Sequence, residues 1–89
     1  MRRIDDPFQA FMPSVDLHGF DSVLAVIKVK EFITDCLKLK NYDIILIHGK
    51  GSGILRRSVH DYLKTDKRVL SYKLDNFNDG ATIVRLKGE

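Results

Sequence analysis

Hydrophobic residues return along the chain at two spacings, one typical of helices and one of strands. Over residues 21–40 they recur every three or four positions, which predicts a long helix with one apolar side, Asp21 as its N-cap and Asn41 at its exit. The same spacing predicts a second helix over residues 54–64. The expected buried positions are Ala25, Val26, Val29, Phe32, Ile33, Cys36 and Leu37 in the first helix and Leu55, Val59, Tyr62 and Leu63 in the second.

Four shorter segments predict strands: residues 14–18, 43–47, 69–74 and 81–86. The second segment contains a continuous apolar run, which is typical of a central strand or of one buried on both faces. In the third, Leu70, Tyr72 and Leu74 alternate with Ser71 and Lys73. The predicted order is therefore β-α-β-α-β-β, an α/β fold.

The 89 residues are enough for one domain with a thin core. Residues 1–13 are predicted to form an N-terminal arm, because Pro7 and Pro13 disfavour regular structure there. Residues 14–89 are predicted to form the folded domain. The arm side chains able to pack back onto it are Phe8, Phe11 and Met12.

Composition excludes several classes of protein. A hydrophobic content of 44% fits a globular chain rather than a disordered one. Cys36 is the only cysteine, so an internal disulfide is excluded and a reducing compartment is expected. No apolar run approaches the ~20 residues of a membrane span, and Asp5 and Asp6 interrupt the N-terminus where a signal peptide would be apolar. We expect a cytoplasmic protein with no membrane partner.

Positive charge is concentrated in one part of the chain. The net charge is only +3, but residues 48–73 hold seven Lys or Arg residues against Asp61 and Asp66. The segments before and after this stretch each have a net charge of −1. Such polarity is typical of an anion-binding face, and a solvated helix surface is the alternative.

Two histidine–glycine pairs end the first two predicted strands, which flank a helix. Such a βαβ unit is right-handed with parallel strands, and parallel neighbours end at the same edge of the sheet. His18-Gly19 and His48-Gly49, 30 residues apart, should therefore be neighbours in space. Ligands of α/β proteins bind at this edge.

The loop after the second strand has the composition of an anion-binding loop, with three glycines in five residues. Glycines let backbone N–H groups approach a phosphate, lysine can pair with it, and the following helix adds a favourable N-terminal dipole. A flexible turn is the alternative. A Walker A loop and a dinucleotide fingerprint are excluded, because Ile44 and Ile54 occupy positions where those motifs need glycine. The loop consists of Gly49, Lys50, Gly51, Ser52 and Gly53.

Asp16 and His18 are two positions apart on a predicted strand, so their side chains are expected to share a face. A carboxylate that orients an imidazole is a common acid–base arrangement. The alternative is a structural aspartate that caps the next helix beside a half-buried histidine. For His48, which ends a buried strand, a hydrogen-bonded structural role is the alternative to a catalytic one.

The second predicted helix carries a polar stripe. Arg56, His60 and Lys64 are spaced four apart and are expected on its exposed side, with His60 at the surface. No zinc site is expected, because the single cysteine has no partner and the histidines lack metal-type spacing. A Ser/His/Asp triad around Ser52 lacks the strand-to-helix nucleophile elbow.

Two tetrapeptides carry a family resemblance. Asp16-Leu17-His18-Gly19 and His48-Gly49-Lys50-Gly51 resemble the Asp-Leu-His-Gly and His-Gly-Lys-Gly signatures of the Smr, or small MutS-related, domain family. The likeness covers residues 14–87, nearly the whole chain. Further matching positions are Ala25, Phe32, Ile33, Gly53, Leu55, Arg56, Val69, Tyr72, Gly80, Thr82, Val84 and Leu86.

This resemblance implies a two-layer α/β sandwich with a mixed four-stranded sheet, like the C-terminal domain of translation initiation factor 3, with an antiparallel fourth strand between the second and third. It implies an endonuclease that nicks DNA or cleaves RNA, including messenger RNA on stalled ribosomes in some members. Other members bind nucleic acid or ribosomes without proven cleavage. The expected catalytic residues are Asp16, His18 and His48. The expected phosphate-binding residues are Gly49, Lys50, Gly51, Ser52, Gly53, Arg56, Arg57 and Lys64.

One loop departs from the family pattern. Many relatives carry extra glycines before the last strand, whereas Asn76-Phe77-Asn78-Asp79 precedes Gly80 here, which leaves the loop's contribution to substrate binding open. Many Smr domains end a larger protein with an ATPase, so this domain is expected to be a stand-alone form or an excised one. The expected partners are DNA or RNA, with a ribosome or a MutS-type ATPase as further candidates. Whether a divalent metal held by Asp16 takes part is left open.

Overall fold

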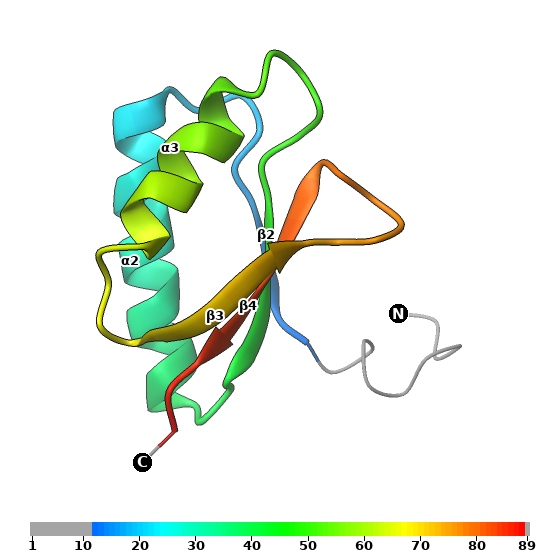
Figure 1. The fold of residues 1–89 in the computed structure, drawn as a ribbon. Helices are drawn as coiled ribbons and strands as arrows, with labels where there is room; N and C mark the ends of the chain where they lie inside the picture. Colours follow the sequence, from blue (N-terminus) through cyan, green and yellow to red (C-terminus); the bar gives the residue numbers. More distant parts are fainter. Residues whose placement is uncertain (1–11, 89) are drawn as a thin grey trace.

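The computed structural model describes residues 12–88, and its elements follow the predicted β-α-β-α-β-β order (Figure 1). They are β1 (Ser14–Asp16), α2 (Ser22–Lys38), β2 (Asp43–Ile47), α3 (Ile54–Leu63), β3 (Val69–Leu74) and β4 (Ala81–Leu86). Most of the predicted N-terminal arm, with Phe8 and Phe11, lies outside the described residues. Within residues 12–88, no helix has the length and apolar character that a membrane crossing requires.

The four strands form one mixed sheet in the order β1-β2-β4-β3. β1 and β2 are parallel, and the other two pairs are antiparallel, so the predicted place of the fourth strand is confirmed. Ile47 lies opposite both Asp16 of β1 and Ala81 of β4. The ends of β1 and β2 and the start of β4 therefore meet at one edge of the sheet, which we call the histidine edge.

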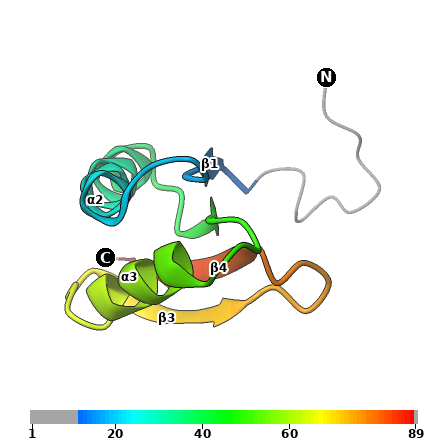
Figure 2. The same cartoon turned by 90° about the horizontal axis from the view of Figure 1, so that it is seen from above.

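Both helices cover the same face of the sheet, which gives two layers (Figures 1 and 2). In β2, Ile44 and Leu46 face the helices and are fully buried, while Ile45 and Ile47 point to the other face and are half-buried. The apolar run of β2 is therefore that of a central strand with one covered face. The core consists of Leu17, Ala25, Val29, Ile33, Cys36, Ile44, Leu46, Val59, Leu63, Val84 and Leu86.

The first strand and the first helix end differently from the prediction. β1 stops at Asp16 rather than at His18, because the Asp16 carboxylate accepts a hydrogen bond from the His18 backbone N–H (3.0 Å) and closes a turn. Asp21 is the N-cap of α2, as predicted, and accepts from the backbone N–H of Leu24 (2.8 Å). At the other end α2 stops at Lys38, Lys40 takes the left-handed conformation (φ 60°), and Asn41 closes the helix exit by donating its backbone N–H to the Cys36 carbonyl (2.8 Å).

The predicted alternation in β3 is interrupted at its start. Val69 pairs with Leu86, but the next pairing begins at Ser71, so Leu70 is the extra residue of a β-bulge. The bulge turns Leu70 outward, where it is exposed, and lets Val69 pack against the core. The interpretation of Leu70 as part of the apolar side of β3 was therefore wrong, since one inserted residue reverses the alternation.

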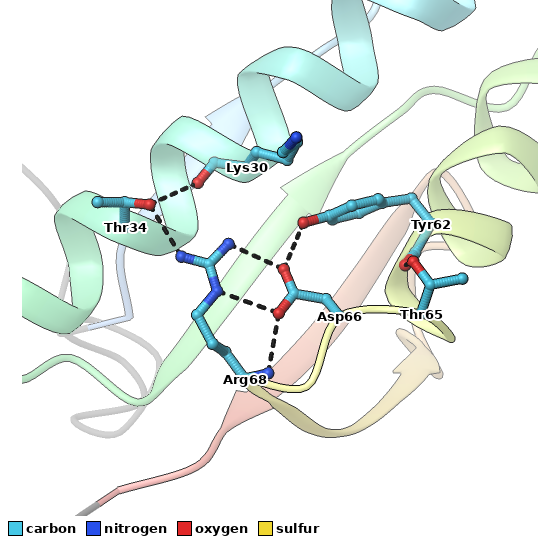
Figure 3. Close-up of polar contacts among 6 residues, drawn as sticks. All are labelled: Lys30, Thr34, Tyr62, Thr65, Asp66 and Arg68. Atoms are coloured by element: carbon cyan, nitrogen blue, oxygen red, sulfur yellow. Dashed lines mark hydrogen bonds and ion pairs between the residues drawn. The ribbon is translucent and has the colours of Figure 1, made fainter.

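A polar cluster ties the helices to β3 at the end of the sheet opposite the histidine edge (Figure 3). Asp66 accepts two hydrogen bonds from the Arg68 guanidinium, through Nε (3.0 Å) and Nη2 (2.9 Å), and a third from the Tyr62 hydroxyl of α3. Arg68 also donates from Nη1 to Thr34 Oγ1 of α2 (2.9 Å), and that hydroxyl donates to the Lys30 carbonyl. We call these residues the far-end cluster.

Candidate functional site

The two histidine–glycine motifs lie side by side at the histidine edge, as their parallel strands predict. A groove of about 500 Å³ is lined by His18, Lys50 and the glycine loop, together with the first residues of both helices. At Gly49 the backbone has a φ of 85°, and a Cβ there would lie 3.5 Å from the Cβ of His18. Glycine therefore permits the left-handed turn, whereas a Cβ would make only an ordinary van der Waals contact with His18.

Asp16 and His18 form an exposed pair at the end of β1. Asp16 Oδ1 lies 3.2 Å from His18 Nδ1, and the side chains are 59% and 74% exposed. Hydrogen bonds from the backbone and then the side chain of His18 hold the pKa of the Asp16 carboxyl below its usual range. An ionised carboxylate only accepts hydrogen bonds, so Nδ1 carries the hydrogen and Nε2 is left for proton transfer.

His48 occupies the floor of the groove and is only 4% exposed. Its Nδ1 lies 3.1 Å from the Gly49 carbonyl and its Nε2 lies 2.8 Å from Thr82 Oγ1. Since a carbonyl only accepts, Nδ1 donates to Gly49 and Nε2 accepts from the Thr82 hydroxyl. Burial lowers the pKa of this imidazole, so the neutral form is favoured. Both ring nitrogens of His48 are thus bonded within the domain.

The prediction that His60 lies on the exposed side of α3 was wrong. His60 is half-buried: its Nε2 lies 2.7 Å from Thr82 Oγ1, and its ring packs edge-on against Tyr72 (4.9 Å between centroids). Because the Thr82 hydroxyl gives its one hydrogen to His48, it accepts from His60. Burial, followed by the charges of neighbouring groups, lowers the pKa of His60 as well.

Thr82 joins the two buried histidines into a network that the sequence reasoning missed. It is fully buried on the helix-facing side of β4, opposite Leu46. A signal was present: a threonine at an inward position of an apolar strand needs a hydrogen-bond partner, and histidine is one of the few side chains that can both donate and accept. The partners are His48, which directly follows β2, and His60 of α3, 34 and 22 residues away, so their identity required the fold.

The loop before β4 is held against the glycine loop. The Gly80 carbonyl accepts hydrogen bonds from the backbone N–H groups of both His48 (2.9 Å) and Gly49 (2.8 Å). A Cβ on Gly80 would lie 3.1 Å from Lys50 Cγ and 3.2 Å from the Gly49 carbonyl carbon, so a larger residue would push the loops apart. Lys50 Nζ also lies 3.7 Å from Asp79 Oδ1 at the surface.

The structure divides the predicted phosphate-binding residues into two groups. The glycine loop, including Ser52, and Arg56 line the groove, and Gly53 begins α3 without a side-chain cap, so the helix N-terminus faces the same space. Arg57 is exposed on α3 but does not line the groove. Lys64 follows the last turn of α3 and lies 3.9 Å from Asp61, away from the groove.

Few side chains near the groove could bind a metal ion. Among residues 12–88, no three His, Cys, Asp or Glu side chains gather closely enough to hold a metal ion. Asp16 would be a single protein ligand for an ion whose other ligands are water and phosphate oxygens. Cys36 is buried in the core, and burial raises the pKa of its thiol.

Known proteins resemble this chain over most of its length. Residues 15–87 match the family model of the Smr domain. The chain is 38% identical over 77 residues to the endonuclease MutS2 of Clostridium beijerinckii and 36% identical over 70 residues to that of Clostridium perfringens. These matches cover 83% and 79% of the chain but 10% and 9% of those proteins. The chain therefore spans about a tenth of the length of the curated relatives it matches.

Solved structures share the mixed four-stranded sheet and two helices. The Smr domain of Thermus thermophilus MutS2 superposes with a TM-score of 0.84 at 31% identity, covering 86% of this chain and all of that one. YdaL, a stand-alone small MutS-related protein from Escherichia coli, has a TM-score of 0.81 at 22% identity, with 90% and 71% covered. The second likeness is one of fold alone. Together they confirm the predicted fold class.

Proposed function

The chain belongs to the Smr domain family, and on that premise we propose that the groove at the histidine edge binds nucleic acid and cleaves its phosphodiester backbone. The observation that supports this most is the exposed Asp16–His18 pair, whose histidine lines the same groove as the glycine loop and Lys50. The MutS2 relatives are named endonucleases, and the proposal extends that activity to this domain.

For RNA, the chemistry needs no group beyond those of the groove and solvent. His18 Nε2 takes the proton of a 2′-hydroxyl, whose oxygen bonds to the adjacent phosphorus while the bond to the 5′-oxygen breaks and that oxygen takes a proton from solvent. Lys50 and the N–H groups of the glycine loop and α3 stabilise the charge on the phosphate oxygens. Asp16 holds the His18 ring in the required tautomer.

For DNA, water replaces the 2′-hydroxyl as the nucleophile, and a divalent ion bound by Asp16 would supply Lewis-acid assistance. Asp16 would then hold the ion and His18 would accept the proton of the attacking water. The catalytic role expected for His48 stays a prediction. Its burial and bonded nitrogens favour a positioning role, in which it anchors the glycine loop through the Gly49 carbonyl.

Binding is proposed to be independent of sequence and to rest on phosphate contacts. Such contacts release counterions, so the affinity should fall steeply with salt. Lys50 and Arg56 line the groove and should each contribute about one unit to the salt slope. Lys38→Ala is a matched control, because it removes the same charge at the far end of α2.

The deciding experiment measures cleavage of supercoiled plasmid and of structured RNA, each with and without EDTA, by the wild type, Asp16→Ala and His18→Ala. Asp35→Ala, an exposed aspartate on α2, is the matched control. We expect the wild type and the Asp35→Ala control to cleave one of the two substrates, and Asp16→Ala and His18→Ala to leave it uncleaved. Equal cleavage by all four proteins would refute the assignment of the site.

A different result would favour a different function. If neither substrate is cleaved while Lys50-dependent binding persists, the domain is a binding module that acts beside a partner such as a ribosome or a MutS-type ATPase. The MutS2 relatives are named endonucleases as whole proteins, of which the matched segment is about a tenth, and this proportion is what favours the alternative. A cytoplasmic location stays a prediction from the sequence.

A further inference from the structure

Phe77 is the most exposed large hydrophobic side chain of residues 12–88. It is 96% exposed, compared with 73% for Val23 and 72% for Leu39, the next in order. It lies in the loop of residues 75–80, which joins β3 to β4 and projects away from the two helices (Figures 1 and 2). A bare aromatic ring at a loop tip contributes nothing to the core, so its presence suggests contact with another molecule.

The loop holds Phe77 in a defined backbone conformation. The Asp75 carboxylate accepts from the Phe77 backbone N–H (2.9 Å), and the Asn78 side-chain oxygen accepts from the Gly80 N–H (3.0 Å). Two backbone bonds close the base of the loop, from Asp75 N–H to the Ala81 carbonyl (3.0 Å) and from Ala81 N–H to the Asn78 carbonyl (3.1 Å). The ring is therefore displayed on a preorganised turn, which reduces the entropy lost on binding.

The loop that carries Phe77 is fixed relative to the groove. Gly80, three residues after Phe77, accepts the backbone N–H groups of His48 and Gly49, and Asp79 pairs with Lys50. The loop that carries the ring is thus bonded directly to the loop proposed to hold a phosphate. A ligand with a phosphate in the groove therefore lies beside the loop that carries Phe77.

The charges of the loop indicate which part of a nucleic acid meets it. Asp75 and Asp79 flank Phe77 and are exposed or half-exposed, so this loop repels a phosphate backbone. A nucleobase is uncharged and offers a flat face on which an aromatic ring can stack. Inside a duplex both faces of each base are already covered by their neighbours, so only an unpaired or terminal base is available.

We propose that Phe77 stacks on an unpaired base of the nucleic acid whose phosphate occupies the groove, and that the domain therefore prefers single-stranded or unpaired segments over continuous duplex. This rests on the proposed function, because it takes the groove as a phosphate site. The stacking ring reads no base identity and acts on any sequence. Phe77 is thus a specificity-determining residue for the strandedness of the substrate.

The test measures the affinity of the wild type, Phe77→Ala, Phe77→Leu and Phe77→Tyr for a labelled single-stranded oligonucleotide and for its duplex at one salt concentration. Loss of one stacked base should weaken single-strand binding by about 5- to 150-fold in the alanine variant. Leucine should not restore the affinity, since it is apolar without a ring, and tyrosine should. Duplex binding should change little. Because the side chain is exposed, circular dichroism should show all variants folded.

A spectroscopic readout is independent of affinity. The chain has no tryptophan, so Phe77→Trp makes position 77 the only tryptophan of the protein, and its fluorescence can be followed there. A single-stranded oligonucleotide should quench it, and an abasic oligonucleotide with the same phosphates should not. Two results would overturn the stacking role. One is Lys50-dependent binding by the wild type with the same affinity in Phe77→Ala, and the other is equal quenching by the abasic strand. Either result would favour a protein partner as the contact of Phe77. Absence of all nucleic-acid binding by the wild type would overturn the proposed function itself.

Discussion

The two ends of the domain contain the same short motif, an aspartate that contacts the residue two positions later, but the motif is exposed at one end and partly buried at the other. Asp16-Leu17-His18 at the histidine edge and Asp66-Lys67-Arg68 in the far-end cluster each place an aspartate two residues before a cationic or ionisable side chain. In both, the carboxylate accepts the backbone N–H of the third residue, at 3.0 Å and 2.8 Å, and contacts its side chain.

The surroundings determine what each pair does. The Asp66 side chain is 5% exposed and is also bonded to Tyr62, while Arg68 reaches Thr34 on α2, so the pair joins three elements (Figure 3). Hydrogen bonds from Arg68 hold the pKa of Asp66 far below its usual range. Both side chains of the Asp16–His18 pair are mostly exposed. A bonded pair with a buried carboxylate stabilises the fold, whereas an exposed pair is accessible to a substrate.

Removal of the His18 side chain at the histidine edge should change cleavage more than any other substitution. His18→Ala should reduce cleavage by ~10²–10⁴-fold, the usual contribution of a general acid–base group. Its melting temperature should stay close to that of the wild type, because the side chain is exposed. Initial rates and thermal melts on the same preparation measure both quantities. A melting temperature lowered as far as in Arg68→Ala would show that the exposed pair is structural.

Asp16→Asn separates the charge of the carboxylate from its role in the turn. The amide oxygen can still accept from the His18 backbone N–H, so the turn should persist, but the charge that favours the Nδ1–H tautomer is lost. Cleavage should fall while the melting temperature stays near that of the wild type. Full activity in this variant would show that Asp16 serves only the turn.

The second prediction concerns the far end. Arg68→Ala leaves the buried Asp66 carboxylate without its main partner, which should cost about 2–3 kcal/mol of unfolding free energy. In a domain of this size that lowers the melting temperature by about 10–20 °C. Cleavage per folded molecule, measured well below the melting temperature, should equal that of the wild type. A large loss of activity at that temperature would show that the two ends are coupled.

The sequence could predict the elements but not the difference between the two aspartate turns. Apolar spacing located both helices and all four strands, and the βαβ rule brought His18 and His48 to one edge. The bulge at Leu70 was beyond reach, because one inserted residue leaves the local pattern of apolar positions unchanged while it reverses the faces. Nor does spacing distinguish Asp16 from Asp66, since burial depends on what packs over each turn.

The sequence also failed to predict how the histidines beneath the groove are buried. His60 follows a polar spacing on α3 that is typical of a solvent-facing side, yet its ring turns toward Thr82 and Tyr72. Its partners belong to strands whose place opposite α3 is decided by tertiary packing. Spacing in sequence therefore identified the exposed residues of the groove and missed the network beneath it.

The third prediction tests that network. Thr82→Val keeps the shape of the side chain but leaves a buried nitrogen of both His48 and His60 without a partner, which should cost about 1–2 kcal/mol of unfolding free energy. Thr82→Ser, which retains the hydroxyl, is the matched control and should lose less. Chemical denaturation of the three proteins measures the difference. Identical midpoints for valine and threonine would mean that the histidines find other partners.

The stability of the domain should depend only weakly on pH. Burial lowers the pKa of both His48 and His60 in the folded state, so below the unfolded value of about 6.5 the unfolded chain binds protons that the folded one does not. Their contribution to stability is complete above that value and declines as the pH falls toward the lowered folded values. The melting temperature should therefore fall as the pH is lowered from 7.5 to 5.5, and it should fall less steeply in His60→Gln, which removes one of the two groups.

Thr82→Ser is the control, because both imidazoles stay in place. Its melting temperature should change with pH as steeply as that of the wild type. If His60→Gln has the same slope as the wild type, the protons are taken up by other groups. The buried His60 would then contribute nothing to the pH dependence of stability.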